Sequence, residues 1–312
     1  IKTHILDTAD RFSNLLDKIE NGRCINLQNA LSNTFITDVS VISPADDFDV
    51  TSYNPTPSEQ LELFSQKRAI SAVTGGNHTL ILMDDGTVWS FGNNQYDALG
   101  ADVSGNIDCS TPVQVIGLDN VVSIAASYFS SYAIKNDGSL WSWGDNEYGQ
   151  LGDGTNYGQP IPQPVFVGEV TSVAAGHVHA LALGADNIVY LWGDNAYGQL
   201  NYSYDYLPFN YYPSAATESF VNPSSVGAGD FTSAVLDDDL RSLRMCGSNY
   251  SGELKNGTFT DSWEFTPVNN NEYVYMYALG ASHGIIERTC AVDTWGSNSN
   301  GQLGINNNFQ NI

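Results

Sequence analysis

Three histidines are the side chains best suited to acid–base or metal chemistry in this sequence. Each follows a small residue at one spacing: Gly75-x-x-His78, Gly176-x-x-His179 and Gly280-x-x-His283. An imidazole can exchange protons near neutral pH or bind a metal through a ring nitrogen. The three occupy equivalent positions in well-separated segments, so they are not expected to converge on one site. We expect each ring to satisfy backbone groups where a strand starts.

The cysteines show no metal-binding pattern. They are Cys24, Cys109, Cys246 and Cys290. None forms a C-x-x-C pair, which makes a zinc site improbable, and their even number permits disulfides without requiring them. Cys246 stands where related segments carry tryptophan or phenylalanine, which favours a small buried residue.

Carboxylates and glycines give no catalytic motif either. Asp145, Glu147 and Asp153 could be imagined around calcium, but no EF-hand loop accompanies them, and solvated carboxylates are the expected state. The sequence contains no G-x-S-x-G motif, no phosphate-binding glycine-rich loop and no paired carboxylates at catalytic spacing. It therefore predicts a protein that is not an enzyme and holds no metal or cofactor.

Aromatic side chains gather in one stretch, NYSYDYLPFNYYP, which begins at Asn201. Its rings are Tyr202, Tyr204, Tyr206, Phe209, Tyr211 and Tyr212. Tyrosine combines a large contact area with few rotatable bonds and a hydroxyl group, so the stretch suits recognition of a protein or a glycan. Alternatively, it folds over the edge of its own sheet and buries its rings. We predict these six residues as the candidate ligand-binding site.

These residues belong to segments that repeat along the chain. The segment SLWSWGDNEYGQLG, which starts at Ser139, has four counterparts that share a glycine with it. The shared glycines are Gly92, Gly144, Gly193, Gly247 and Gly296. Subtracting successive numbers gives 52, 49, 54 and 49 residues. Such a period predicts a repeat architecture.

Each repeat has the pattern of a four-stranded antiparallel sheet. Two apolar runs flank the small-x-x-polar element, and an Asp-Gly turn at Asp85-Gly86 or Asp137-Gly138 leads to a third, alternating strand. A proline-valine pair downstream leaves room for a fourth. Repetition of such sheets predicts an all-β fold, a β-propeller. The predicted units are residues 61–110, 111–161, 162–215, 216–266 and 267–312.

The pattern W-G-x-N-x-x-G-Q-L-G, followed by a proline-valine pair, a V-x-x-(V/I)-A-A-G-x-x-H run and a D-G hairpin, resembles the regulator of chromosome condensation repeat family. The resemblance covers about residues 61–312. It implies a ring that commonly has seven blades. We expect five to six blades in this chain, or seven if it is a fragment. The resemblance also implies nucleotide exchange on a small GTPase, the activity of the family's founder.

The first sixty residues have a different character. In TADRFSNLLDKIE, residues 8–20, Phe12, Leu15, Leu16 and Ile19 have the spacing of an amphipathic helix. Residues 24–43 are typical of one or two strands, which could add a partial sixth blade, and residues 44–60 of a polar linker. Because Ile1 is not methionine, we expect a processed or trimmed chain. Residues 1–60 could anchor the propeller to a larger assembly.

Charge limits the classes of partner. Eleven Lys and Arg against 35 Asp and Glu give a net charge of −24, which disfavours binding to nucleic acid or to anionic membranes. No apolar run is long enough for membrane insertion.

We therefore predict a non-catalytic binding or display module. It would be a structural or receptor-binding component exposed on a virion, a cell surface or a secreted assembly, and thus extracellular or on a surface. Its partners would be proteins of a larger assembly, or a glycan or surface receptor. The alternative is a guanine-nucleotide exchange factor-like regulator of a small GTPase.

Overall fold

The repeats form five antiparallel sheets, which we call blades one to five. The computed structural model describes residues 57–101, 108–202, 208–238, 242–268, 273–288 and 291–305. The helix predicted over 8–20, the strands predicted over 24–43 and any sixth blade built from them lie outside the described residues. The all-β propeller predicted from the repeats is confirmed, with five blades.

The strands are divided among the five blades in chain order. Blade one contains β1 (Ala69–Thr74), β2 (His78–Met83), β3 (Val88–Gly92) and β4 (Cys109–Gln114). Blade two contains β5 (Val121–Ala126), β6 (Ser130–Lys135), β7 (Leu140–Gly144) and β8 (Gln159–Val165). Blade three contains β9 (Val170–Ala175), β10 (His179–Gly184), β11 (Val189–Asp194) and β12 (Phe209–Ala215). Blade four contains β13 (Pro223–Ala228), β14 (Thr232–Asp237), β15 (Ser242–Gly247) and β16 (Ser262–Pro267). Blade five contains β17 (Val274–Leu279), β18 (His283–Arg288) and β19 (Ala291–Gly296).

The fourth strand of a blade forms where the proline-valine pair predicted it. Pro112 and Val113 lie in β4, and Pro164 and Val165 lie in β8. These strands run past residues 110 and 161, where the predicted units end, because the fourth strand pairs back onto the third strand of its own blade.

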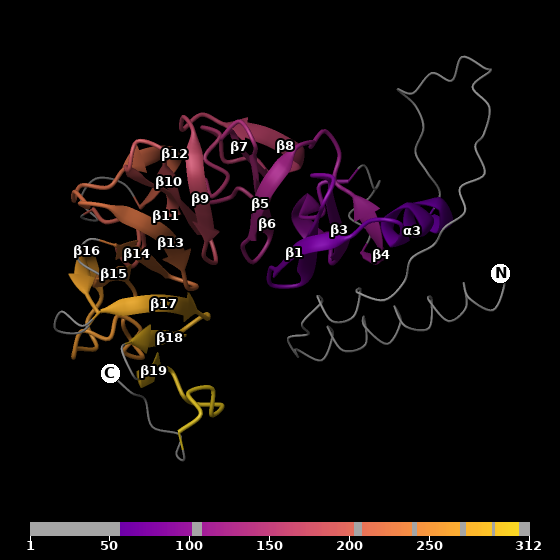
Figure 1. Ribbon diagram of the computed structural model, residues 1–312. Coiled ribbons are helices and arrows are strands. Elements are labelled where there is room, and N and C mark those ends of the chain that lie inside the picture. The colour runs from indigo at the N-terminus through magenta and orange to yellow at the C-terminus, as the bar shows by residue number, and fades with distance from the viewer. Residues whose placement is uncertain are drawn as a thin grey trace, which may run out of the picture.

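The blades follow one another around an arc (Figure 1). The first strands of successive blades, β1, β5, β9, β13 and β17, contact one another in order, so they form the inner side of the arc. Blades one to four then extend outward to a fourth strand, and the described part of blade five has three strands. Blades one and five lie at the two separated ends of the arc (Figure 1).

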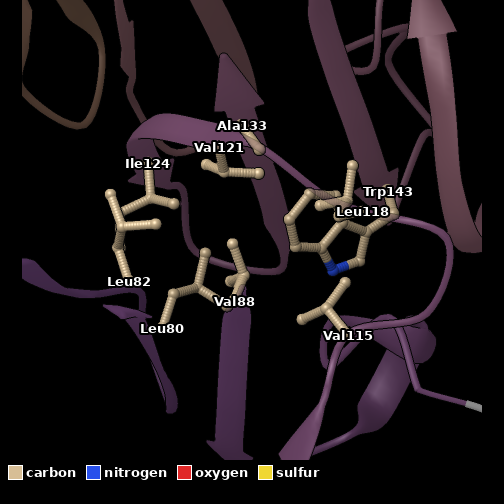
Figure 2. Packing of buried hydrophobic residues seen from close by; sticks show 9 residues of the cluster. All are labelled: Leu80, Leu82, Val88, Val115, Leu118, Val121, Ile124, Ala133 and Trp143. Atoms are coloured by element: carbon tan, nitrogen blue, oxygen red, sulfur yellow. The ribbon is translucent and has the colours of Figure 1, made fainter. Parts of the chain in front are cut away.

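The hydrophobic core lies between the blades. The cluster between blades one and two contains Leu80, Leu82, Val88, Val115, Leu118, Val121, Ile124, Ala133 and Trp143 (Figure 2). Comparable clusters fill the later interfaces. Alternate residues of a strand point to opposite faces of its sheet, so each blade contributes side chains to both of its neighbours. Cys246 is fully buried in one of these clusters, which confirms its predicted place as a small core residue.

A short helix, α3 (Pro57–Ser65), covers the free face of blade one. Its Phe64 is buried and packs edge-on against Trp89, with ring centroids 5.5 Å apart. The sequence prediction of a linker over 44–60 is wrong for residues 57–60. Proline punctuates this stretch, but it is well tolerated in the first turn of a helix. Within the described residues, no helix is long and apolar enough to cross a membrane.

The outer face of blade five, equivalent to the face that blade one packs against blade two, is left uncovered by the described residues. Leu80 and Ile285 occupy equivalent positions, two residues after the strand-leading histidine. Val88 and Val292 are also equivalent, each four residues before the shared glycine of its blade. Leu80 and Val88 are fully buried, whereas Ile285 is 41% and Val292 65% exposed. Leu80 and Val88 are buried because they pack against blade two, whereas no described blade follows blade five.

Candidate protein-binding face

One end of all five sheets carries two kinds of connection. The turns between first and second strands and the loops between third and fourth strands emerge there, because successive strands are antiparallel. We call this end the belt face. The Asp-Gly turns lie at the opposite end.

An asparagine fixes each loop of the belt face. The Oδ1 atom of Asn146 accepts the backbone N–H of Leu151, five residues ahead, at 2.9 Å. The same bond recurs in the other blades, at Asn94 to Leu99, Asn195 to Leu200, Asn249 to Leu254 and Asn298 to Leu303. It explains why the repeat requires asparagine before Gly-Gln-Leu, since the amide closes the loop on itself.

The glutamine of the loop presents a tyrosine outward. In blade two, Gln150 accepts the N–H of Tyr148 through Oε1 and donates to Asp145 through Nε2. In blade three, Gln199 does the same with Tyr197 and Asp194. Both the oxygen and the nitrogen of the glutamine amide therefore have hydrogen-bond partners within the loop. The side chains of Tyr148 and Tyr197 are exposed.

The turns of the belt face are joined by backbone hydrogen bonds between blades. Gly76 N–H donates to the carbonyl of Tyr128 at 3.1 Å, and His177 N–H donates to that of Asp230 at 2.8 Å. Asp230 N–H in turn donates to Ala281 at 2.9 Å. These bonds fix the relative positions of the turns from one blade to the next.

Aromatic rings follow these turns in a continuous row. We call the row the aromatic belt; its members are Tyr96, Tyr128, Phe129, His177, Tyr197 and Phe231. Centroid separations are 5.0 Å for Tyr96–Phe129, 4.6 Å for Phe129–Tyr128, 4.4 Å for Tyr128–His177, 5.5 Å for His177–Phe231 and 5.0 Å for Phe231–Tyr197. Rings at such separations attract one another, so the row is pre-organised.

The belt face is rich in carboxylates. Its turns and loops include Asp97, Asp108, Asp145, Glu147, Asp153, Asp194, Asp230, Glu253 and Asp261. Burial raises the pKa of Asp230, against an opposing effect of His177. Burial also raises the pKa of Asp194.

Every Lys and Arg of the described residues is paired with a carboxylate. The pairs are Lys67–Asp85, Arg68–Asp84, Lys135–Asp119, Arg244–Glu218, Lys255–Asp293 and Arg288–Asp293. Among these six described side chains, only Lys255 comes from a loop of the belt face, and its side chain is buried.

The predicted backbone partner is not found among the described residues for His78, the strand-leading histidine of blade one. Nε2 of His78 lies 2.9 Å from Oγ of Ser131, which belongs to the next blade. This ring therefore contacts a side chain across the interface, where we had expected a backbone group. Burial lowers the pKa of His78 and of His179 to about 4. Both rings are neutral at physiological pH.

Four of the six predicted ligand-binding residues fall among the described ones. Of these, Phe209 and Tyr211 contact each other, with ring centroids 5.3 Å apart. Tyr202 is half-buried and packs against the cluster between blades three and four. Tyr204 and Tyr206 lie outside the described residues. Phe209, Tyr211 and Tyr212 lie on β12.

The rings on β12 lie over blade two. Tyr211 is half-buried, its carbonyl accepts Gly154 N–H at 3.0 Å, and its ring lies over Gly149. Tyr212 lies beside Gly154 and is exposed. Trp263 lies over Gly198 in the same way in the next blade, so Tyr211 occupies a regular position of the repeat.

The sequence did not reveal the aromatic belt. The signal was present: the two residues inside each small-x-x-polar element are Tyr128-Phe129, His177-Val178 and Asp230-Phe231. These residue types differ from one repeat to the next. Within the described residues, no three His, Cys, Asp or Glu side chains are grouped to hold a metal ion.

Similar proteins point to one family. A family model described as an RCC1-like domain matches residues 43–311. The protein pim1 of Schizosaccharomyces pombe is 32% identical over 115 residues, which cover 33% of this chain and 21% of pim1. The X-linked retinitis pigmentosa GTPase regulator of Mus musculus is 35% identical over 101 residues, which cover 31% of this chain and 10% of that protein. The chain spans less than a quarter of the length of either relative.

Solved structures agree on the fold. Human WBSCR16 superposes with a TM-score of 0.69 at 24% identity, covering 79% of this chain and 66% of that one. Prp20p of Saccharomyces cerevisiae superposes with a TM-score of 0.63 at 24% identity, covering 75% and 57%. With the family model matched over most of the chain and its repeat present in five copies, the chain belongs to the RCC1-like domain family.

Proposed function

We propose that this chain is a protein-binding propeller that regulates a small GTPase by promoting release of its nucleotide. The match to the RCC1-like domain over residues 43–311 supports this proposal most directly. One relative is named a GTPase regulator, and the description of the Prp20p structure refers to binding of Gsp1p and histones. Those statements concern the relatives, and this chain shares their repeat.

A regulator of this kind needs no catalytic side chains. Exchange breaks no covalent bond; it requires a surface that binds the nucleotide-free GTPase more tightly than the loaded one. A surface with fixed geometry is suited to this, because little binding energy is then lost in ordering it. The belt face meets this requirement, since backbone hydrogen bonds and ring contacts hold its turns together.

Display on a virion or a cell surface is the second candidate function, after regulation of a GTPase. That prediction relied on acidity, on loops rich in Asn, Gly and Tyr, and on residues 1–60 as an anchor, and the similar proteins give it no support. The similar proteins likewise give no support to recognition of a glycan or a surface receptor. A location outside the cytoplasm stays a prediction from composition.

The test is nucleotide release. Small GTPases, with Gsp1p as the first candidate, are loaded with a fluorescent GDP, and its release is followed with and without the purified chain. We expect acceleration of roughly tenfold or more for a cognate GTPase, a lowering of the barrier by about 1.4 kcal/mol. Asp230→Asn on the belt face should reduce it, while Asp137→Asn in a turn at the opposite end should not. Unchanged release across the panel would reject exchange activity.

A further inference from the structure

The fold does not require aromatic rings in the turns of the belt face. All five blades form the turn, yet blade one uses Gly76-Asn77 and blade five uses Ala281-Ser282. Neither pair contains a ring. The rings of the three middle blades are thus additions to a turn that closes without them.

These rings are held near the surface. Tyr96, Tyr128 and Tyr197 are 42%, 38% and 40% exposed, and Phe129, His177 and Phe231 are half-buried. Each ring contacts another member of the belt, so little conformational entropy would be lost in ordering the rings when a partner binds. Aromatic side chains presented in this way are typical of binding hot spots.

The charges around the rings indicate the partner. Asp97 and Asp230 are sequence neighbours of the belt rings Tyr96 and Phe231, and Glu147 lies in another loop of the belt face. The one described lysine of this face, Lys255, is paired with Asp293. The ring faces are themselves electron-rich and attract cations. Rings and carboxylates together favour guanidinium and ammonium groups and repel phosphates.

We infer that the aromatic belt binds an arginine-rich segment of a protein partner, whose guanidinium groups stack on the exposed tyrosines beside the carboxylates. Arginine fits better than lysine, because its planar group can stack on a ring and bond a carboxylate at its edge. The inference rests only on the protein-binding part of the proposed function; it does not require a GTPase.

The experiment measures binding of a fluorescein-labelled peptide of alternating arginine and serine to the full chain by anisotropy. The double variant Tyr128→Ala, Tyr197→Ala should weaken binding about tenfold, since two stacking sites are lost. Tyr250→Ala is the matched control: Tyr250 lies in a loop of the same face and is exposed, but outside the belt. It should change the dissociation constant less than about twofold, within the range of a neutral contact. Circular dichroism of each variant checks that the propeller is retained.

Three results would overturn the inference. The chain could fail to bind the arginine peptide at low salt, the belt variant and Tyr250→Ala could weaken binding equally, or the chain could bind maltohexaose in place of the peptide. A lysine peptide of equal charge should bind more weakly. Nucleotide release is measured on the same variants. Loss of peptide binding with exchange unchanged would separate the belt from the exchange surface, and peptide binding without any exchange would reject the exchange proposal alone.

Discussion

The indole N–H of Trp143 in blade two donates to the backbone carbonyl of Ala98 in blade one at 3.0 Å. Trp192 makes the same bond to Gln150 at 2.7 Å, and Trp295 makes it to Glu253 at 2.6 Å. In each case the acceptor is the residue before the loop leucine. The tryptophan of the repeat thus connects its blade to the loop of the blade before it. Cys246 replaces this tryptophan in blade four, where its sulfur lies 3.7 Å from the carbonyl of Gln199.

Trp143→Phe should lower the free energy of unfolding by about 2 kcal/mol, because it removes a buried hydrogen bond and part of a packed ring. Trp141→Phe is the control. Its indole donates only to Ser139 in the turn of its own blade, at 3.1 Å, and it is half-buried. Urea denaturation followed by circular dichroism should show a larger shift for Trp143→Phe. Equal shifts would mean that the contact between blades adds nothing.

The repeat made the sheets predictable, because the turn, strand and loop signals of each blade lie within one stretch of sequence. The aromatic belt was not predictable in this way. Its neighbours in space, such as Tyr128 and His177, lie in different repeats, and rules of periodicity describe residues of one element. Tyr211 shows the same limit, since it contacts a glycine of the preceding blade. Helix α3 was missed because a proline permits both a helix start and a linker.

Leu80→Ala should cost about 3 kcal/mol, since it leaves a cavity between blades one and two. Ile285→Ala removes an apolar side chain from the equivalent position of blade five, where the described residues leave it partly exposed. Its cost should stay below about 1 kcal/mol, because little apolar surface is buried there. Urea denaturation midpoints of the two variants, compared with that of the parent protein, measure this difference in stability. A comparable loss for Ile285→Ala would show that this face is covered in solution.

Stability should fall as the pH is lowered from about 6.5 to about 4, because His78 and His179 have a pKa of about 4 in the folded chain. Above this window the histidines are neutral in both states and contribute no pH dependence. Within it the unfolded chain binds protons that the folded chain does not, so unfolding becomes easier. The full effect is roughly 3 kcal/mol for each histidine.

The double variant His78→Gln, His179→Gln isolates this contribution. Asp194 and Asp230 have raised pKa values and act in the opposite direction, since a folded chain that binds protons first gains stability as the pH falls. They remain in the variant. Its stability should therefore decline less between pH 7 and pH 4 than that of the parent. Parallel curves for the two proteins would reject the assignment to these histidines.

Gly149→Ala should destabilise the chain more than Gly117→Ala. Both glycines have a left-handed backbone, with φ of +79° and +74°, so alanine costs about 1 kcal/mol of strain at either position. Only at Gly149 would the new methyl group overlap the ring of Tyr211; around Gly117 there is open space. The difference between their denaturation midpoints measures the contact between blades two and three. In a Tyr211→Ala background the difference should shrink but not vanish, because the backbone of residues 210 and 211 also lies close to Gly149. A difference that stays unchanged in that background would place the tyrosine ring away from the loop.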